Sequence, residues 1–238
     1  MNNTIEKIKA LSVLSENINP TIIYNEGWMI RLLVIQSMIE KSKIKGIDFG
    51  KLATKNWSSE ALIKSPFVET KKNREGYTHA DIILGDFIVN YDERGEVVLN
   101  ESAKILGIIE AKMGSNLSQG TKNAKNYNQA SRNICCLSYV TRNSPNCEIF
   151  FVVVAPEETI KKNEIENQIK QEKVLNQIKA RFQHSAEEYC SEIQEQAEKC
   201  KILTISYKEW INEIKNYEVK KILDEFYGKC ISCNKIKP

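Results

Sequence analysis

The sequence predicts an α/β fold in which a mixed central β-sheet is flanked by helices. Apolar, strand-like runs occur at 79–90, 96–99, 104–113, 147–155 and 201–206, and each is bounded by turn-forming residues. Longer stretches with helical periodicity lie at 21–43 and 121–140. With 238 residues, of which 42% are hydrophobic, the chain can bury the core of one large domain spanning 1–238.

The composition excludes several classes of protein. The net charge of +3 neither requires nor excludes a nucleic-acid partner. Seven cysteines without a disulfide-like pattern are typical of a reducing compartment. The N-terminus lacks the features of a signal peptide. No apolar run reaches the roughly 18 residues of a membrane span. We therefore expect a soluble cytoplasmic protein with no membrane partner.

The N-terminal quarter is predicted to be helical. Apolar residues three apart indicate an amphipathic helix over 4–15, which Asn19-Pro20 interrupts. The helix predicted over 21–43 is apolar nearly all round, as in a helix covered on both sides. Glu26 lies on one apolar side, so its carboxylate is directed inward; alternatively, it is an acid that favours the helix dipole. A short helix is predicted over 56–64, and 67–76 reads as an exposed basic connection.

The centre of the chain contains the residues that carry chemistry. The runs 79–90 and 96–99 flank Asp92–Gly95 and are predicted to form an antiparallel hairpin. Asp81 lies within the first run. Near the end of 104–113, Glu110 and Lys112 are two residues apart and so share one face of a strand. Because an acid and an amine beside a buried strand are costly unless they pair or bind something, this strand end is the first candidate site.

The helix predicted over 121–140 follows that strand through a short loop, which keeps it near the carboxylates. A charged helix face is ordinarily only solvated. Here the polar face is also a candidate contact surface, and it contains Lys122, Lys125, Gln129, Arg132 and Asn133.

The C-terminal part is predicted to be mostly helical. Residues 159–200 are highly charged, with an apolar stripe that indicates docking onto the core. After strand 201–206, Ser206 and Glu209 form a capping box that opens a last helix ending near Tyr227. Cys230 and Cys233 supply at most half of a zinc site, and no histidine lies nearby, so zinc is not favoured.

Two carboxylates beside a lysine are suited to a hard divalent cation. Mg²⁺ prefers oxygen ligands, keeps some of its waters and is often held by one or two carboxylates. It can activate water and neutralise charge on phosphate oxygens. The chain has only two histidines and lacks the glycine-rich phosphate-binding motifs, so His-based catalysis and nucleotide binding by a P-loop have little support.

Asp81 in HADIIL and Glu110-Ala111-Lys112 in IIEAKMGS resemble the motif of the PD-(D/E)xK nuclease superfamily. The resemblance implies a restriction endonuclease-like core at about 20–155, with a family-variable C-terminal elaboration over 156–238. It implies that Asp81, Glu110 and the Ala111 carbonyl bind the metal and that Lys112 is the catalytic lysine. Glu26 and Gln129 match accessory positions of the superfamily.

The chain departs from the superfamily pattern in two ways. Ala80 stands where proline often precedes the aspartate, and 29 positions separate Asp81 from Glu110, which is longer than usual. The longer spacing makes Asp86 a competitor for the first ligand. Asp81 is preferred because Asp86 follows Gly85 at an expected bend.

The expected function is a Mg²⁺-dependent nuclease, with Mn²⁺ as a substitute, that hydrolyses DNA as a restriction-like endonuclease does. Lys122, Lys125 and Arg132 are the expected phosphate contacts. Three alternatives stay open. The pair of Glu110 and Lys112 could be an ordinary salt bridge. The fold could be a catalytically silent binding module. The long helical segment could dock a partner, which includes a second copy in a homodimer.

Overall fold

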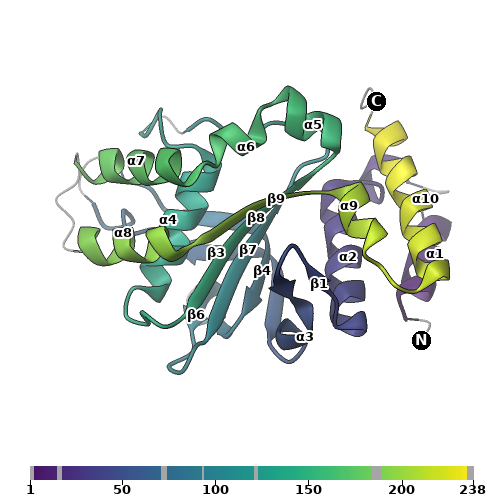
Figure 1. Ribbon diagram of the computed structural model, residues 1–238, viewed down its shortest axis with the longest axis horizontal. Helices are drawn as coiled ribbons and strands as arrows, with labels where there is room; N and C mark the ends of the chain where they lie inside the picture. The colour runs from purple at the N-terminus through teal and green to yellow at the C-terminus, as the bar shows by residue number, and fades with distance from the viewer. Residues whose placement is uncertain are drawn as a thin grey trace.

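The computed structural model describes residues 3–14, 18–70, 74–92, 94–120, 123–183 and 189–234. It is an α/β structure in which a seven-stranded mixed sheet lies between two layers of helices (Figure 1). The strand order is β5-β6-β3-β4-β7-β8-β9. These strands are β3 (Asn56–Lys64), β4 (Tyr77–Gly85), β5 (Phe87–Asn90), β6 (Glu96–Leu99), β7 (Ile105–Ala111), β8 (Glu148–Ala155) and β9 (Lys201–Ser206).

The two helical layers come from different parts of the chain. One face of the sheet is covered by α1 (Asn3–Leu14), α2 (Glu26–Glu40), α3 (Phe49–Leu52), α9 (Tyr207–Asn212) and α10 (Tyr217–Cys233). The other is covered by α4 (Gln129–Thr141), α5 (Glu157–Lys162), α6 (Ile165–Gln168), α7 (Gln171–Phe182) and α8 (Cys190–Lys199). A short 3-10 helix, η1 (Pro20–Ile22), and the small hairpin of β1 (Lys43–Ile44) and β2 (Ile47–Asp48) flank α2.

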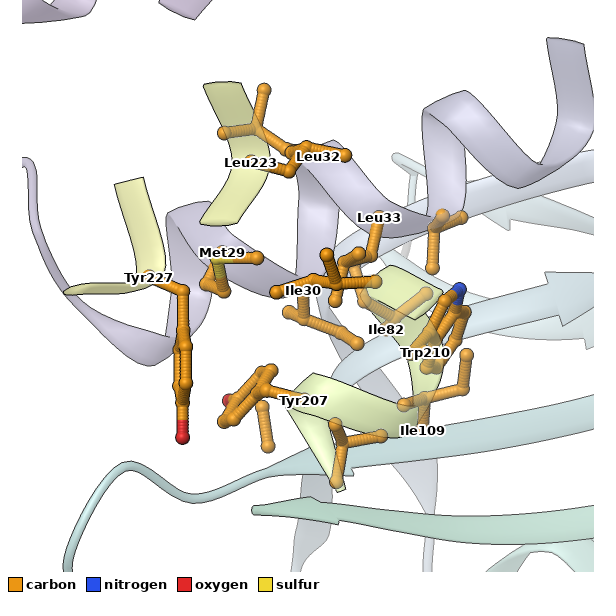
Figure 2. Packing of buried hydrophobic residues seen from close by; sticks show 14 of the residues in the cluster. Met29, Ile30, Leu32, Leu33, Ile82, Ile109, Tyr207, Trp210, Leu223 and Tyr227 are labelled. Atoms are coloured by element: carbon orange, nitrogen blue, oxygen red, sulfur yellow. The ribbon is translucent and has the colours of Figure 1, made fainter. Parts of the chain in front are cut away.

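Successive side chains of the central strands point to opposite faces of the sheet, which creates two hydrophobic cores. In β7, Ile109 packs in the cluster under α2, while Ile108 packs in the cluster under α4. The α2 cluster, shown in part in Figure 2, joins the N-terminal and C-terminal helices to the sheet through Ile30, Trp210 and Leu223. Because strands buried on both faces must be apolar on both, a polar residue near such a strand is conspicuous.

The topology brings several strand ends to one edge of the sheet. β7, β8 and β9 run parallel, with Ala111 beside Val154 and Val154 beside Ile205. β4 runs antiparallel to β7, with Ile82 beside Ile109. The residue before Ile82 therefore lies beside the residue after Ile109, at the edge where β7 ends.

The strands 104–113, 147–155 and 201–206 are confirmed, whereas the helix predicted over 56–64 is wrong because this segment is strand β3. Pairing with β4 over its length stabilises the strand. Ala61 and Ile63 point into the core. Glu60, by contrast, has a left-handed φ of 55° in mid-strand. This irregularity and the polar first half of the segment remove the alternation that marks a strand.

The predicted run 79–90 is two strands. Asp86 separates β4 from β5, and only β5 pairs with β6 as the antiparallel hairpin, whereas β4 pairs with β3 and β7. Gly85 has a φ of +137°, and a Cβ there would lie 2.2 Å from the Ile105 carbonyl oxygen, so the chain turns here by close backbone approach.

Four helix predictions also need correction. The helix expected over 121–140 begins at Gln129, where Asn128 caps it by accepting the Ser131 N–H at 2.9 Å. The helix expected over 21–43 is η1 followed by α2, and the final helix is divided into α9 and α10. The stretch 159–200 contains α5, α6, α7 and α8 instead of one long helix. In the described ranges, none of the helices combines the length and apolar character needed to cross a membrane.

Candidate active site

The structure brings Asp81 of β4 and Glu110 of β7 together. Continuing the β4–β7 register places them on neighbouring strands, and the two carboxyl groups lie within hydrogen-bonding reach of each other. Asp81 is fixed from the other side, because the Ala111 N–H donates to its Oδ2 at 2.7 Å. Two acids in contact are unfavourable unless a proton or a cation is shared between them, which marks this pair as a functional candidate.

Glu110 lies at the centre of the site and is only 1% exposed. Its Oε1 accepts hydrogen bonds from Lys112 Nζ and Gln129 Nε2, both at 2.6 Å. Its Oε2 accepts from Asn133 Nδ2 at 3.1 Å. These three donors hold the carboxyl group in one orientation, facing Asp81.

Burial and neighbouring charges together shift the pKa of Glu110. Its pKa is raised to about 8, first by burial and then by the negative charge and hydrogen bonding of Asp81, while the Lys112 ammonium opposes the shift. The repulsion between the two carboxylates favours the protonated form of Glu110. A cation bound between Asp81 and Glu110 would relieve this repulsion.

Lys112 directly follows β7 and is held in place by its own backbone. Its N–H donates to the Val154 carbonyl at 2.8 Å, which continues the ladder to β8 past the end of β7. Burial acts to lower the pKa of Lys112, but the carboxylates of Glu110, Asp81 and Glu26 outweigh it and the pKa is raised. The side chain is 12% exposed and remains a cation beside the two acids.

Gln129 is positioned by the loop that joins β7 to α4. As the first residue of α4, it donates its backbone N–H to the Ser118 carbonyl at 2.8 Å, and its Oε1 accepts the Ser118 N–H at 3.3 Å. Its amide oxygen is thereby used by the loop, which leaves the Nε2 group directed at Glu110.

The same loop is tied to the C-terminal helices by side-chain amides. Gln168 of α6 accepts from Gln119 Nε2 and donates to Asn116 Oδ1, both at 2.8 Å. Asn128 donates to the Gln168 carbonyl at 3.1 Å. Helix α6 thus helps to fix the loop that carries Gln129.

The sequence interpretation placed Asn133 on the polar helix face without giving it a role in the site. It lies four residues after Gln129, so both side chains project from one side of α4 toward Glu110. Thr78 donates its hydroxyl to Asn133 Oδ1, which sets the amide with its NH₂ group toward Glu110. The spacing of four residues between Gln129 and Asn133 could have predicted that Asn133 also faces Glu110.

Glu26 is the first residue of α2, which Asn25 caps by accepting the Trp28 N–H at 3.0 Å. Its carboxylate raises the pKa of Lys112 and so lies within electrostatic reach of the site. The side chain is partly exposed. It therefore borders the acids on the α2 side, opposite the α4 donors.

The expected phosphate contacts are not brought together. Lys122 lies outside the described residues, and Lys125 is exposed in a turn before α4. Arg132 instead pairs with Glu75, with Nε 2.8 Å from Oε1, and its side chain is 16% exposed. Arg132 is thus part of an internal ion pair rather than a surface contact.

Asp86 is engaged elsewhere. Its Oδ1 lies 2.6 Å from Lys55 Nζ, and its Oδ2 accepts the N–H groups of Lys104 and Ile105 at 2.9 and 3.2 Å. Lys104 and Ile105 lie at the start of β7, whereas Glu110 lies near its end. Asp86 is therefore committed to a structural role away from Glu110.

The chemistry of the donors suits a hard divalent cation that keeps much of its water. Asp81, Glu110 and the Ala111 carbonyl supply oxygen, the ligand that Mg²⁺ prefers. In the part of the chain that the structure describes, no group of three or more His, Cys, Asp or Glu side chains is arranged to hold a metal. A cation would thus be held by two carboxylates, a carbonyl and water, and it would displace a donor from Glu110.

Comparison with known proteins adds no further assignment. No family model, curated protein or solved structure matches the chain. The geometry around Asp81 and Glu110 is therefore the basis for inferring a function.

Proposed function

We propose that this protein is a Mg²⁺-dependent nuclease that hydrolyses phosphodiester bonds of DNA on a PD-(D/E)xK-like core at about 20–155. The observation that supports the proposal is the placement of Asp81 and Glu110 side by side on β4 and β7, with the Lys112 ammonium 2.6 Å from Glu110. A surface salt bridge would not need the second acid, nor the two amides that orient the first.

Each residue would have a distinct role. Asp81, Glu110 and the Ala111 carbonyl would hold the cation, which when bound supplies charge neutralisation and a more acidic water. Lys112, a cation that is not a ligand, would stabilise the negative charge that develops on the phosphate oxygens or orient the attacking water. Gln129 and Asn133 would hold Glu110 in its orientation, and Glu26, which is partly exposed, would border the site on the α2 side.

The test compares Lys112→Met and Glu110→Gln with the wild type. Lys112→Met keeps the apolar stem but removes the charge, so plasmid and linear-DNA cleavage in Mg²⁺ should fall by about 100-fold or more, because one stabilising donor is lost. Calorimetric Mn²⁺ binding should persist. Glu110→Gln should lose both cleavage and Mn²⁺ binding, because the cation loses one of two charged ligands.

The chain supplies matched controls in the pair of Lys55 and Asp86, which also joins a lysine and a carboxylate at 2.6 Å. Lys55→Met and Asp86→Asn should lower thermal stability yet leave Mn²⁺ binding and cleavage at wild-type levels below the melting transition. Wild-type cleavage by Lys112→Met would reduce Glu110 and Lys112 to a structural ion pair, and cleavage that persists in EDTA would contradict metal dependence.

A catalytically silent DNA-binding or partner-docking module is the second candidate. The observation that favours it is that both oxygens of Glu110 are already occupied by side-chain donors in a site that is 1% exposed. This candidate predicts no Mn²⁺ binding and no cleavage by the wild type. It would also predict either a DNA mobility shift or an assembly larger than 27.3 kDa by light scattering.

A further inference from the structure

Tyr207 carries a buried hydroxyl that the fold does not use. It is the first residue of α9 and directly follows β9, at the edge where β7 and β8 also end. The residue is 0% exposed, and its hydroxyl has no hydrogen-bond partner among the residues described. Leaving such a group unpaired costs about 1–3 kcal/mol, so native proteins satisfy it with water or a ligand.

The local packing shows which way the Tyr207 side chain lies. Its ring contacts that of Tyr227, with centroids 5.4 Å apart. In Figure 2 the ring lies on the Met29 side of the cluster, away from Trp210. Met29 follows Glu26 by three residues in α2, and residues three apart share a helix face. The ring therefore lies toward the end of α2 that carries Glu26.

Two further observations describe the surroundings of the Tyr207 side chain at this end of α2. Cys230 of α10 contacts the carbonyl oxygen of Asn25, the residue before Glu26, at 3.8 Å from its Sγ. The pKa of Tyr207 is raised well above its ordinary value by burial, and after burial by Glu26, Cys230 and Asp81. Glu26, Cys230 and Asp81 thus lie within electrostatic reach of the hydroxyl.

We propose that the Tyr207 hydroxyl donates a hydrogen bond to a water molecule that Glu26 also holds, and that this water belongs to the hydration shell of the cation at Asp81 and Glu110. This inference rests on the proposed metal site. It assigns Tyr207 of α9 the role of a positioning residue for that site. Because Mg²⁺ retains several waters, a protein group that orients one of them fixes the cation without supplying a ligand.

The test is Tyr207→Phe, which removes only the hydroxyl. The melting temperature without metal should be unchanged or higher, because the lost group has no hydrogen-bond partner among the residues described. The Mn²⁺ affinity measured by calorimetry should fall about tenfold, as for other residues that act on a metal through an intermediary. The rise in melting temperature caused by Mn²⁺ should shrink accordingly.

Tyr227→Phe is the matched control, since it removes a hydroxyl from the other ring of the same pair. After burial, Cys230, Asp224 and Glu157 raise the pKa of Tyr227, which places its hydroxyl in a different environment. This variant should keep the wild-type Mn²⁺ affinity. A Tyr207→Phe variant that binds Mn²⁺ as tightly as the wild type overturns this inference alone, whereas a wild type that binds no Mn²⁺ overturns it together with the proposed metal site.

Discussion

At the residue scale, Glu110 determines how the candidate site responds to its surroundings. Lys112, Gln129 and Asn133 all donate to its carboxyl group, and Asp81 faces it. Donors stabilise the charged form, whereas burial and the neighbouring acid destabilise it. The second effect dominates, since the pKa is raised to about 8.

Metal binding should therefore release a proton from Glu110. Because its pKa is about 8, Mn²⁺ affinity should rise with pH up to that value and then level off, by about tenfold per pH unit if one proton is displaced. Calorimetry in two buffers with different ionisation enthalpies measures the released proton. An affinity that does not change between pH 6 and 8 would contradict this linkage.

Without metal, the free energy of unfolding should change with pH in the opposite direction. The folded pKa of Glu110 exceeds its ordinary value of 4.5, so between these values the folded state holds more protons than the unfolded state. The contribution of Glu110 to the free energy of unfolding then falls as pH rises through this window. Glu110→Gln should flatten this part of the pH profile, which denaturant titrations at several pH values would show.

At the scale of elements, the loop from β7 to α4 links the candidate site to the C-terminal helices. Gln168 of α6 contacts Asn116 and Gln119 of this loop, and the loop in turn fixes Gln129 through Ser118. Gln168 is 7% exposed, whereas Asn116 and Gln119 are exposed, so these hydrogen bonds are partly buried.

Replacing Gln168 should therefore affect the site from a distance. Gln168→Ala removes the partner of the exposed amides of Asn116 and Gln119, which can then bond to water, so the free energy of unfolding should fall by about 0.5–1.5 kcal/mol. Faster hydrogen exchange over 114–120 and a lower cleavage rate should accompany the loss. Gln171→Ala is the control, since Gln171 bonds instead to the carbonyls of Ala197 and Glu198. Equal exchange in both variants would show that α6 does not fix the loop.

Sequence reasoning succeeded where the signal is local. β8 is an almost continuous apolar run and β9 is rich in Ile and Leu, and strand geometry alone predicts that Glu110 and Lys112 share one face. It failed where a distant partner decides the outcome. β3 depends on pairing with β4, and the guanidinium of Arg132 is held by Glu75, which lies far away in the sequence. The start of α4 could have been predicted from Asn128 as its cap.

At the scale of the whole molecule, the first and last helices share one layer. Trp210 of α9 donates its indole N–H to Ser37 of α2 at 2.8 Å. Glu40, at the end of α2, accepts the N–H groups of Lys215 and Asn216 at 2.8 and 3.1 Å. Helix α2, which carries Glu26, is thus held between the sheet and the C-terminal helices (Figure 1).

A fragment ending at residue 206 should consequently lose the folded state. It would keep every strand of the sheet and nearly the whole candidate site but uncover the apolar side of α2, including Met29 and Leu33. We expect aggregation and no cooperative thermal transition by circular dichroism, whereas a chain ending at residue 234 should unfold as the full chain does. A cooperative transition in the shorter fragment would show that folding does not require α9 and α10.

The shared layer also sets when the fold can close during synthesis of the chain. Helix α2 leaves the ribosome well before its cover, α9 and α10. Domains of a growing chain fold as units, and this unit lacks a layer until α9 and α10 have been released. A nascent chain therefore exposes apolar surface for most of translation and is a natural client for chaperones.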